Sequence, residues 1–171
     1  SGQIRQLSPG GANILESEDI TFGDYYVATV DNKQLTPNIA GIAVDGSGFI
    51  YCYDVSYGRI YLYDKECYML AAFGGGAGKG NQKGTFSAIG GLDLLDGGDR
   101  IVAIDSHDLD ITVFGVTEYG RLLKEADRLD INGDYDKTGG LCREILNRDG
   151  GNVSAYYILA KSAMQSKDYK A

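Results

Sequence analysis

The glycine-rich segment at residues 74–80 (GGGAGKG) is the first candidate for chemistry, because glycine-rich loops that end in lysine can bind phosphate groups. The spacing of a phosphate-binding loop would require glycine at position 73 and a hydroxyl residue at position 80. The sequence has Phe73 and Gly80 there, so no side chain is placed to bind Mg²⁺. We interpret the segment as a linker and predict no cofactor.

A second candidate is an alternating acidic segment between residues 130 and 136 that resembles the ligand spacing of a calcium loop. Its oxygen-bearing residues are Asp130, Asn132, Asp134 and Asp136. A calcium loop also needs glycine at its sixth position and a bidentate glutamate at its twelfth. Tyr135 and Leu141 occupy those positions, so we predict a turn between helices and no metal site.

His107 is the only histidine, and its acidic neighbours (DSHDLD) suggest a base or a metal ligand. A single histidine without a matching nucleophile is a poor catalytic set, and a turn between strands is the favoured interpretation. Aspartates recur where strands should end, at Asp45, Asp54, Asp64 and Asp105. Aspartate side chains accept backbone hydrogen bonds in tight turns, so we predict a structural role for them.

Tyrosines alternate through one stretch of the chain, at positions 51, 53, 57, 61 and 63. Such a series can form a platform for a carbohydrate or a peptide. Alternating tyrosines on strands more often pack within a sheet and extend their hydroxyls to solvent, which is the interpretation we favour. The sequence therefore predicts a protein that is not an enzyme.

The stretch from residue 39 to residue 86 contains the elements that would position these residues. Its four short apolar runs are separated by turns rich in glycine and aspartate, and they cover Ile39–Val44, 49–53, Arg59–Tyr63 and Met69–Phe73. Runs of about five residues rich in Val, Ile and Tyr, with such turns between them, predict a meander of antiparallel strands.

A second copy of this pattern follows at a period of roughly 50 residues. Its apolar runs are Ile89–Leu95, Arg100–Asp105 and 110–114. Gly91 takes the place of Gly41, and Phe114 takes that of Tyr63. Residues 25–30 also have strand composition, and Gly23-Asp24 resembles the end of a preceding copy.

The order and spacing of these residues, GIAVD..G.IY..D....RI..YD......FG, resemble an NHL repeat, the blade of a β-propeller. The resemblance implies a structural ion pair between Asp54 and Arg59. In the second copy Asp110 replaces that arginine, so the pair would be missing there. Propeller lactonases bind calcium through residues from several blades, and the two copies seen here cannot supply such a set.

From Thr117 onward the periodicity changes to that of amphipathic helices. We expect a first helix after Thr117, further helices at 135–147 and Val153–Gln165, and a fourth that starts near Lys167. This half resembles a tetratricopeptide repeat array, with Tyr156 at an aromatic position of the motif. The resemblance implies a groove for a peptide, and the candidate interaction surface is Tyr156, Tyr157 and Lys161.

The bulk composition narrows the classes of partner. The net charge of −8 disfavours nucleic acid, which requires clustered Lys and Arg. Three cysteines without CxxC spacing predict free thiols and neither a disulfide framework nor a zinc site. No apolar run is long enough to span a membrane. The order of elements also resembles bacterial proteins in which a helical repeat follows an NHL propeller, and the compartment stays open.

We predict an α+β chain with an N-terminal segment (1–36), two NHL-like blades (37–115) and a tetratricopeptide-like helical segment (116–171). The expected function is a non-catalytic scaffold for a protein or peptide partner. The alternative is a fragment of a metal-dependent hydrolase or lactonase whose site residues lie on other blades. Because a propeller typically closes with 4–8 blades, we expect homo-oligomerisation or completion by further chain.

Overall fold

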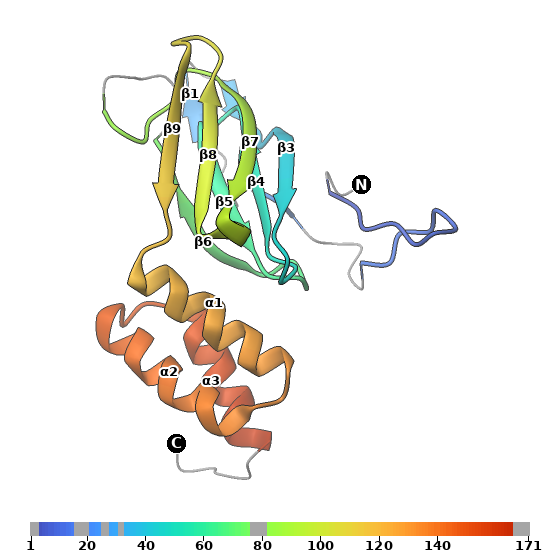
Figure 1. The fold of residues 1–171 in the computed structure, drawn as a ribbon, viewed down its shortest axis with the longest axis vertical. Coiled ribbons are helices and arrows are strands. Elements are labelled where there is room, and N and C mark those ends of the chain that lie inside the picture. The colour runs from blue at the N-terminus through green and yellow to red at the C-terminus, as the bar shows by residue number, and fades with distance from the viewer. Residues whose placement is uncertain (1–3, 16–20, 25–27, 31–32, 76–81, 166–171) are drawn as a thin grey trace. The chain divides into compact units, whose positions relative to one another are not determined.

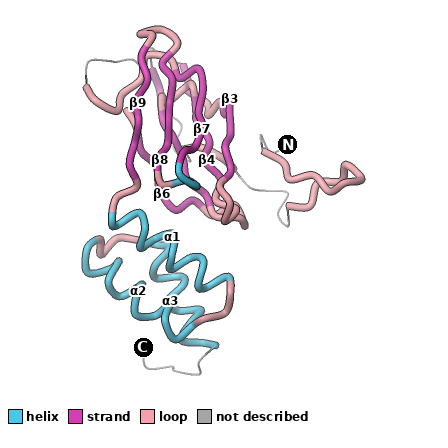
Figure 2. The backbone as a smooth tube through the Cα atoms, viewed as in Figure 1, coloured by secondary structure: helices cyan, strands magenta, loops and turns pink. Residues whose placement is uncertain are grey.

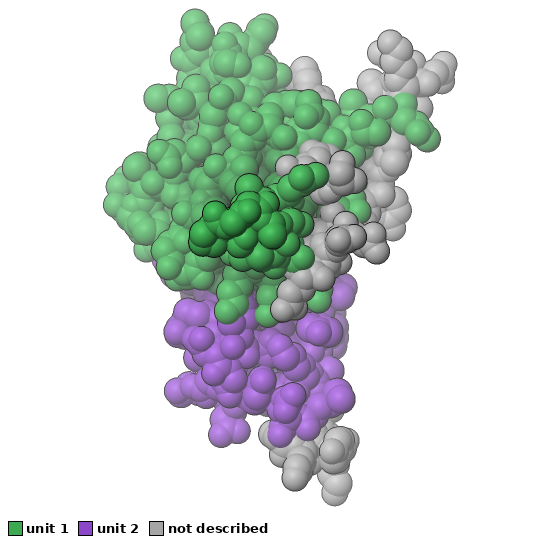
Figure 3. All heavy atoms as spheres, turned by 90° about the vertical axis from the view of Figure 1, so that its right-hand side faces the viewer, with its two compact units in different colours: residues 1–115 green, residues 116–171 purple. Residues whose placement is uncertain are grey.

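The computed structural model describes residues 4–15, 21–24, 28–30, 33–75 and 82–165. The chain divides into two compact units, residues 1–115 and 116–171, which Figure 3 colours separately. The first unit is built from strands and the second from helices (Figures 1 and 2). The predicted α+β class is thus confirmed as two antiparallel sheets followed by three helices.

The first large sheet has four strands in sequential order, as the sequence predicted. They are β3 (Ile39–Val44), β4 (Ile50–Asp54), β5 (Arg59–Tyr63) and β6 (Met69–Phe73). All three neighbouring pairs are antiparallel. This topology follows from the short turns, because only antiparallel strands can be joined by tight hairpins.

The second large sheet has three strands, β7 (Ile89–Leu95), β8 (Arg100–Asp105) and β9 (Asp110–Gly115), with a short helix η1 (Asp96–Gly98) between the first two. Its register repeats a detail of the first sheet. The pairing shifts between Ile39 and Gly41 in β3 and between Ile89 and Gly91 in β7. The two sheets are therefore copies of one unit down to this irregularity.

A small hairpin precedes the large sheets. It pairs β1 (Ala28–Val30) with β2 (Lys33–Leu35). The strand composition of residues 25–30 is thus confirmed for residues 28–30, and residues 25–27 lie outside the described part. Strand β2 was missed, because its polar sequence KQL carries no hydrophobic periodicity.

The first sheet is covered on both faces. One face packs Cys52, Tyr61 and Tyr63 against Ile4 and Phe22 of the N-terminal segment. Residues of the opposite face, including Tyr53 and Ile60, pack on Phe86, Ile89 and Ala103 at the second sheet. The result is a stack in which each layer buries apolar side chains against the next.

An aromatic contact recurs between successive layers of this stack. Phe22 meets Tyr63 edge to face, with ring centroids 5.1 Å apart and an interplanar angle of 69°. Phe73 meets Phe114 in the same manner, at 5.3 Å and 68°. Each leading phenylalanine is followed by a glycine with positive φ, 91° at Gly23 and 90° at Gly74. Gly23 is thus placed like the end of a sheet preceding the first.

The tyrosine series packs inside the first unit, as favoured above, and all five of its side chains are buried. The expectation that their hydroxyls reach solvent is wrong for Tyr57 and Tyr63, and also for Tyr51 and Tyr61, whose hydroxyls are buried. The Tyr57 hydroxyl donates to the Leu35 carbonyl at 2.6 Å, and the Tyr63 hydroxyl accepts from the Gly23 N–H at 2.8 Å. The hydroxyls join segments that are distant in sequence, so this series offers no binding platform.

The predicted ion pair between Asp54 and Arg59 is corrected by the structure. The two residues face each other across β4 and β5, but the Arg59 guanidinium binds Asp24 Oδ2 at 2.7 Å. Asp54 Oδ1 instead accepts the backbone N–H groups of Asn38, Ser56 and Tyr57 at 3.1, 2.8 and 3.3 Å. The other Asp54 oxygen, Oδ2, is buried with no hydrogen-bond partner among the described residues, and the arginine pairs with Asp24 of the preceding segment.

The strand-end aspartates all serve this structural role, as predicted. Asp45 Oδ1 accepts from Ser47 and Phe49, and Asp64 Oδ1 accepts from Glu66 and Tyr68. Asp54 acts as described above, and Asp105 binds four backbone N–H groups, from Ser87, Ala88, His107 and Asp108. All four carboxylates are buried. Each therefore replaces water for the N–H groups of its hairpin.

The second unit contains α1 (Glu118–Ile131), α2 (Tyr135–Arg148) and α3 (Val153–Gln165). Thr117 caps the N-terminus of helix α1, and its hydroxyl accepts the Gly120 N–H at 3.1 Å. The hydrophobic core of this second unit consists of Leu123, Ala126, Cys142, Ile145, Ala155 and Ile158. The three predicted helices are confirmed, and the fourth falls at residues 166–171, outside the described part.

Replacement of Asp105 tests the role of these carboxylates. We expect Asp105→Ala to lower the free energy of unfolding by about 3 kcal/mol or more, because several backbone N–H groups lose a buried acceptor. Asp93→Ala is the matched control, since the exposed Asp93 carboxylate accepts one backbone N–H from the described residues, that of Leu94, and its effect should stay within about 0.5 kcal/mol. Urea unfolding measures both. Equal losses would contradict the assignment.

Candidate functional site

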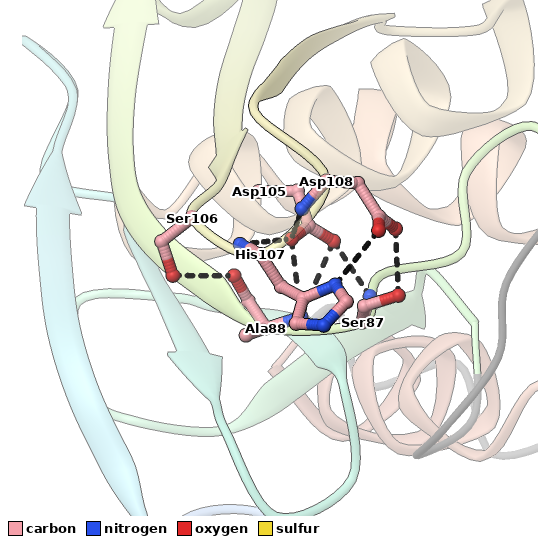
Figure 4. A network of polar contacts seen from close by, with 6 residues as sticks. All are labelled: Ser87, Ala88, Asp105, Ser106, His107 and Asp108. Atoms are coloured by element: carbon pink, nitrogen blue, oxygen red, sulfur yellow. Dashed lines mark hydrogen bonds and ion pairs between the residues drawn. The ribbon is translucent and has the colours of Figure 1, made fainter.

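The turn between β8 and β9 holds the most elaborate polar network among the described residues, and Figure 4 shows it from close by. Asp108 Oδ2 accepts the Ser87 hydroxyl at 2.6 Å, and Asp108 Oδ1 lies 2.8 Å from His107 Nδ1. Beside it, Asp105 accepts the backbone N–H groups of both His107 and Asp108. Sequence reasoning missed Ser87, which lies on the linker before β7.

A serine, a histidine and an aspartate thus meet, but their connectivity differs from that of a hydrolase. In a catalytic triad the histidine lies between serine and aspartate and takes the serine proton. Here the carboxylate of Asp108 lies between Ser87 and His107, so the serine donates to a weak base. The arrangement fixes the turn and provides no activated nucleophile.

The acidity of the two carboxyl groups fits this structural role. Burial raises the pKa of Asp105, but the four backbone N–H groups outweigh it and hold that pKa below its usual value. For Asp108, the hydrogen bonds from Ser87 and His107 lower the pKa. Both groups therefore stay ionised at neutral pH and act as hydrogen-bond acceptors.

A groove of about 320 Å³ lies between β3 and β7. Apolar lining residues include Ile42, Val44 and Leu92, and the charged ones are Asp45 and Asp93. One Asp45 oxygen already accepts two backbone N–H groups. A Cβ on Gly98 would lie 2.9 Å from the other, so the groove wall is closely packed there. Among the described residues that line the groove there is no basic side chain and no serine, cysteine or histidine.

The three cysteines are free and buried. Burial raises the pKa of Cys52 to about 12, and it raises the pKa of Cys67 and of Cys142 to about 11. Nearby carboxylates add to these shifts, through Asp54 for Cys52 and Asp64 for Cys67. Because the thiolate is the reactive form, none of the three is a competent nucleophile near neutral pH.

Two of the three carboxylates of the calcium-like segment bind lysines. Asp134 Oδ2 binds Lys137 Nζ at 2.6 Å, and Asp130 Oδ2 binds Lys161 Nζ at 2.7 Å. Asp130 is a buried residue of α1, so its ion pair with Lys161 links α1 to α3. Among the described residues, no group of three or more His, Cys, Asp and Glu is placed to hold a metal ion.

The predicted interaction surface is therefore brought together in part. Tyr156 and Tyr157 lie on α3 with 54% and 59% of their surface exposed. Lys161 is instead engaged by Asp130. Sequence reasoning missed two exposed apolar residues of the same helix, Val153 and Met164, although their spacing from Tyr157 is a readable signal. We define the α3 face as Val153, Tyr156, Tyr157, Ala160 and Met164, all of them exposed.

The comparisons with known proteins add no family to this geometry. No protein-family model matches the sequence, and no curated protein matches it either. Within the described part of the chain, none of the helices has the length and apolar character that a membrane span requires.

The lowered pKa of Asp105 predicts a pH dependence of stability. A carboxyl group whose folded pKa lies below its unfolded value of about 3.9 stabilises the fold above that pH, and the contribution is lost as the pH falls through the folded pKa. Asp105→Asn removes the titration. We expect the stability difference between the native chain and this variant to shrink from pH 6 to pH 3 in urea unfolding. A difference that grows on acidification would contradict the assignment.

The ion pair between Lys161 and Asp130 predicts an asymmetry between two lysines. Lys161→Met leaves the buried Asp130 carboxylate without its ion-pair partner. We expect the free energy of unfolding to fall by about 2 kcal/mol, less than the ~3–5 kcal/mol lost when a fully buried pair is broken. Lys137→Met, which breaks an exposed pair on the same unit, should cost at most about 1 kcal/mol. Adding Asp130→Asn to Lys161→Met should restore part of the loss. Equal costs for the two lysines in thermal unfolding would refute this role.

Proposed function

We propose that this protein is a non-catalytic interaction scaffold and that the α3 face is where its helical unit binds a protein partner. The observation that carries the proposal is the exposure of large apolar side chains on one helix of a packed three-helix unit. Val153 is exposed over 79% of its surface and Met164 over 68%. Contiguous exposed apolar side chains mark interaction sites more often than isolated ones do.

The spacing of the α3 face favours a helical partner. Val153, Tyr157 and Met164, with Ala160 between the last two, follow one another at intervals of four, three and four residues. This is the spacing by which two helices pack side chains between each other. Ala160 is small enough to allow close approach, and the tyrosines supply large, rigid contact area. The partner chemistry is therefore the apolar side of an amphipathic helix.

Electrostatics on α3 support an apolar contact. The only charged residue between Val153 and Gln165 is Lys161, and its ammonium group binds Asp130. An apolar helix can therefore approach the α3 face without desolvating an isolated charge, which would be costly. Partner selection would rest on shape and apolar area.

We infer a finer architecture as part of the same proposal, with the sheets as NHL-type propeller blades and the helices as tetratricopeptide-like hairpins. The repeated register shift at Gly41 and Gly91 supports the first part, as does the recurring edge-to-face aromatic contact. The helical unit supports the second, since α2 packs against both α1 and α3. The hydrolase alternative has no specific observation in its favour, because Ser87 and His107 bind the same carboxylate.

Photo-crosslinking in the native cell tests the proposal. Benzoylphenylalanine replaces Tyr157 in one protein and Tyr68, an equally exposed tyrosine of the first unit, in the control. We expect an adduct only from position 157. Its mapped residues should lie three, four and seven positions apart on an apolar helix of another protein. Adding Met164→Glu should reduce the yield about tenfold or more, since it places a charge in the contact.

Two results would contradict the scaffold proposal. One is an equal yield of adducts from positions 157 and 68, which would mean that the α3 face has no special affinity. The other is an adduct confined to residues of the same chain, which would mean that the α3 face packs intramolecularly. Insensitivity of the adduct to Met164→Glu would remove Met164 from the contact.

A further inference from the structure

The outer edge of β9 has no strand paired with it among the described residues. It is a separate surface from the α3 face. In the first sheet β5 pairs with β4 on one side and with β6 on the other. Strand β9 occupies the position of β5 in the second sheet, and among the described residues it pairs with β8 alone. Figure 1 shows β9 at the edge of its sheet. In the first sheet β6 fills the fourth position. In the second sheet no described strand occupies that position.

Apart from Asp110 at its first position, the sequence of β9 lacks the features that keep an edge strand from pairing. Its six residues, DITVFG, contain no lysine and no proline, and its register against β8 is regular. Natural sheets protect their edges with such residues or with bulges. Ile, Thr, Val and Phe are instead the residues that favour strand pairing.

One face of this sheet is also open. Ile111 and Val113 on β9 are exposed over 65% and 51% of their surface, and Ile104 on β8 over 46%. The residues that hold the matching positions in the first sheet, Ile60, Leu62 and Tyr53, are buried. The open face is thus a repeat of a surface that the chain already buries once.

We propose that β9 pairs with β9 of a second copy of this chain, antiparallel and about a twofold axis. The two three-stranded sheets would then form one six-stranded sheet. Two registers pair five residues of each strand, and we choose the one that places Thr112 opposite Thr112 of the second copy, with Ile111 opposite Val113. The other, centred on Val113, would place Ile111 opposite Gly115, which has no side chain to pack against it. Residues opposite each other in the chosen register share a face, as antiparallel pairing requires. Two β-branched pairs and a threonine pair lie at its centre.

The local charges of β9 are compatible with a second copy as the occupant. The single charged residue of β9, Asp110, lies opposite Phe114 of the other copy in this register, so no like charges face each other. The pairing also brings Ile111 and Val113 of both copies into one apolar patch. A twofold interface must be complementary to itself, and the sequence of β9 meets that requirement.

Light scattering over a range of protein concentrations tests the proposal at about 0.15 M salt, which screens the repulsion between copies of charge −8. Edge pairing buries little area, so we expect a concentration-dependent equilibrium. The mass should rise from 18.4 kDa toward twice that value. Val113→Lys should abolish the rise, whereas Val44→Lys, at a valine of β3 with 54% exposure, should leave it unchanged.

Trapping by a disulfide gives a second measurement that does not depend on the Val113→Lys variant. With oxidised glutathione as the oxidant, Thr112→Cys should form an intermolecular disulfide, because directly opposed residues in antiparallel strands are 4.5–5.5 Å apart between Cα atoms. Val44→Cys is the matched control and should form no such disulfide. Denaturing electrophoresis without a reducing agent separates the disulfide-linked dimer from the monomer.

The outcomes separate this proposal from the function proposed above. Tyr157→Glu should leave the rise of the light-scattering mass with concentration unchanged, since the α3 face is not part of the β9 pairing. A monomer at every concentration would overturn the proposal, and so would a dimer that Val113→Lys leaves intact. Equal disulfide yields from Thr112→Cys and Val44→Cys would exclude the register centred on Thr112.

Discussion

The burial of aspartate at the ends of strands is the constraint on which the first unit depends. A hairpin that turns within a packed stack leaves backbone N–H groups where water cannot reach them, and each must find an acceptor. Asp54 and Asp105 solve this problem at the same place in successive sheets, each also binding the backbone just before the first strand of its own sheet. A carboxylate does so better than a neutral acceptor, because an ionised oxygen forms stronger hydrogen bonds. The layers can pack closely because the backbone N–H groups of their turns do not depend on water as a hydrogen-bond acceptor.

Much of the fold was readable from the sequence because its signals are local. The turns between strands are marked by residues that accept positive φ, such as Gly48 and Gly58, and the apolar runs between them have the length of strands. The helices were readable because Thr117 caps the first, and because the apolar residues of α1 and α2 recur on one face. Agreement between turn chemistry and periodicity is what made these predictions hold.

The errors concern contacts between segments distant in sequence. The partner of Arg59 was misassigned because the local register places Asp54 opposite it, whereas Asp24 comes from the preceding layer. The bond from Lys161, a residue expected on an interaction surface, to the buried Asp130 carboxylate on α1 was not foreseen. Ser87 was missed because its link to Asp108 spans a whole sheet. In each case a polar side chain found its partner through tertiary packing, which periodicity does not encode.

The state of the three cysteines has a consequence for where such a chain can exist. Each thiol is buried and paired with no other, so no crosslink contributes to the stability of either unit. Protonated thiols exchange slowly with disulfides, because the attacking species is the thiolate. Moving the protein between a reducing and an oxidising compartment should therefore leave its fold unchanged.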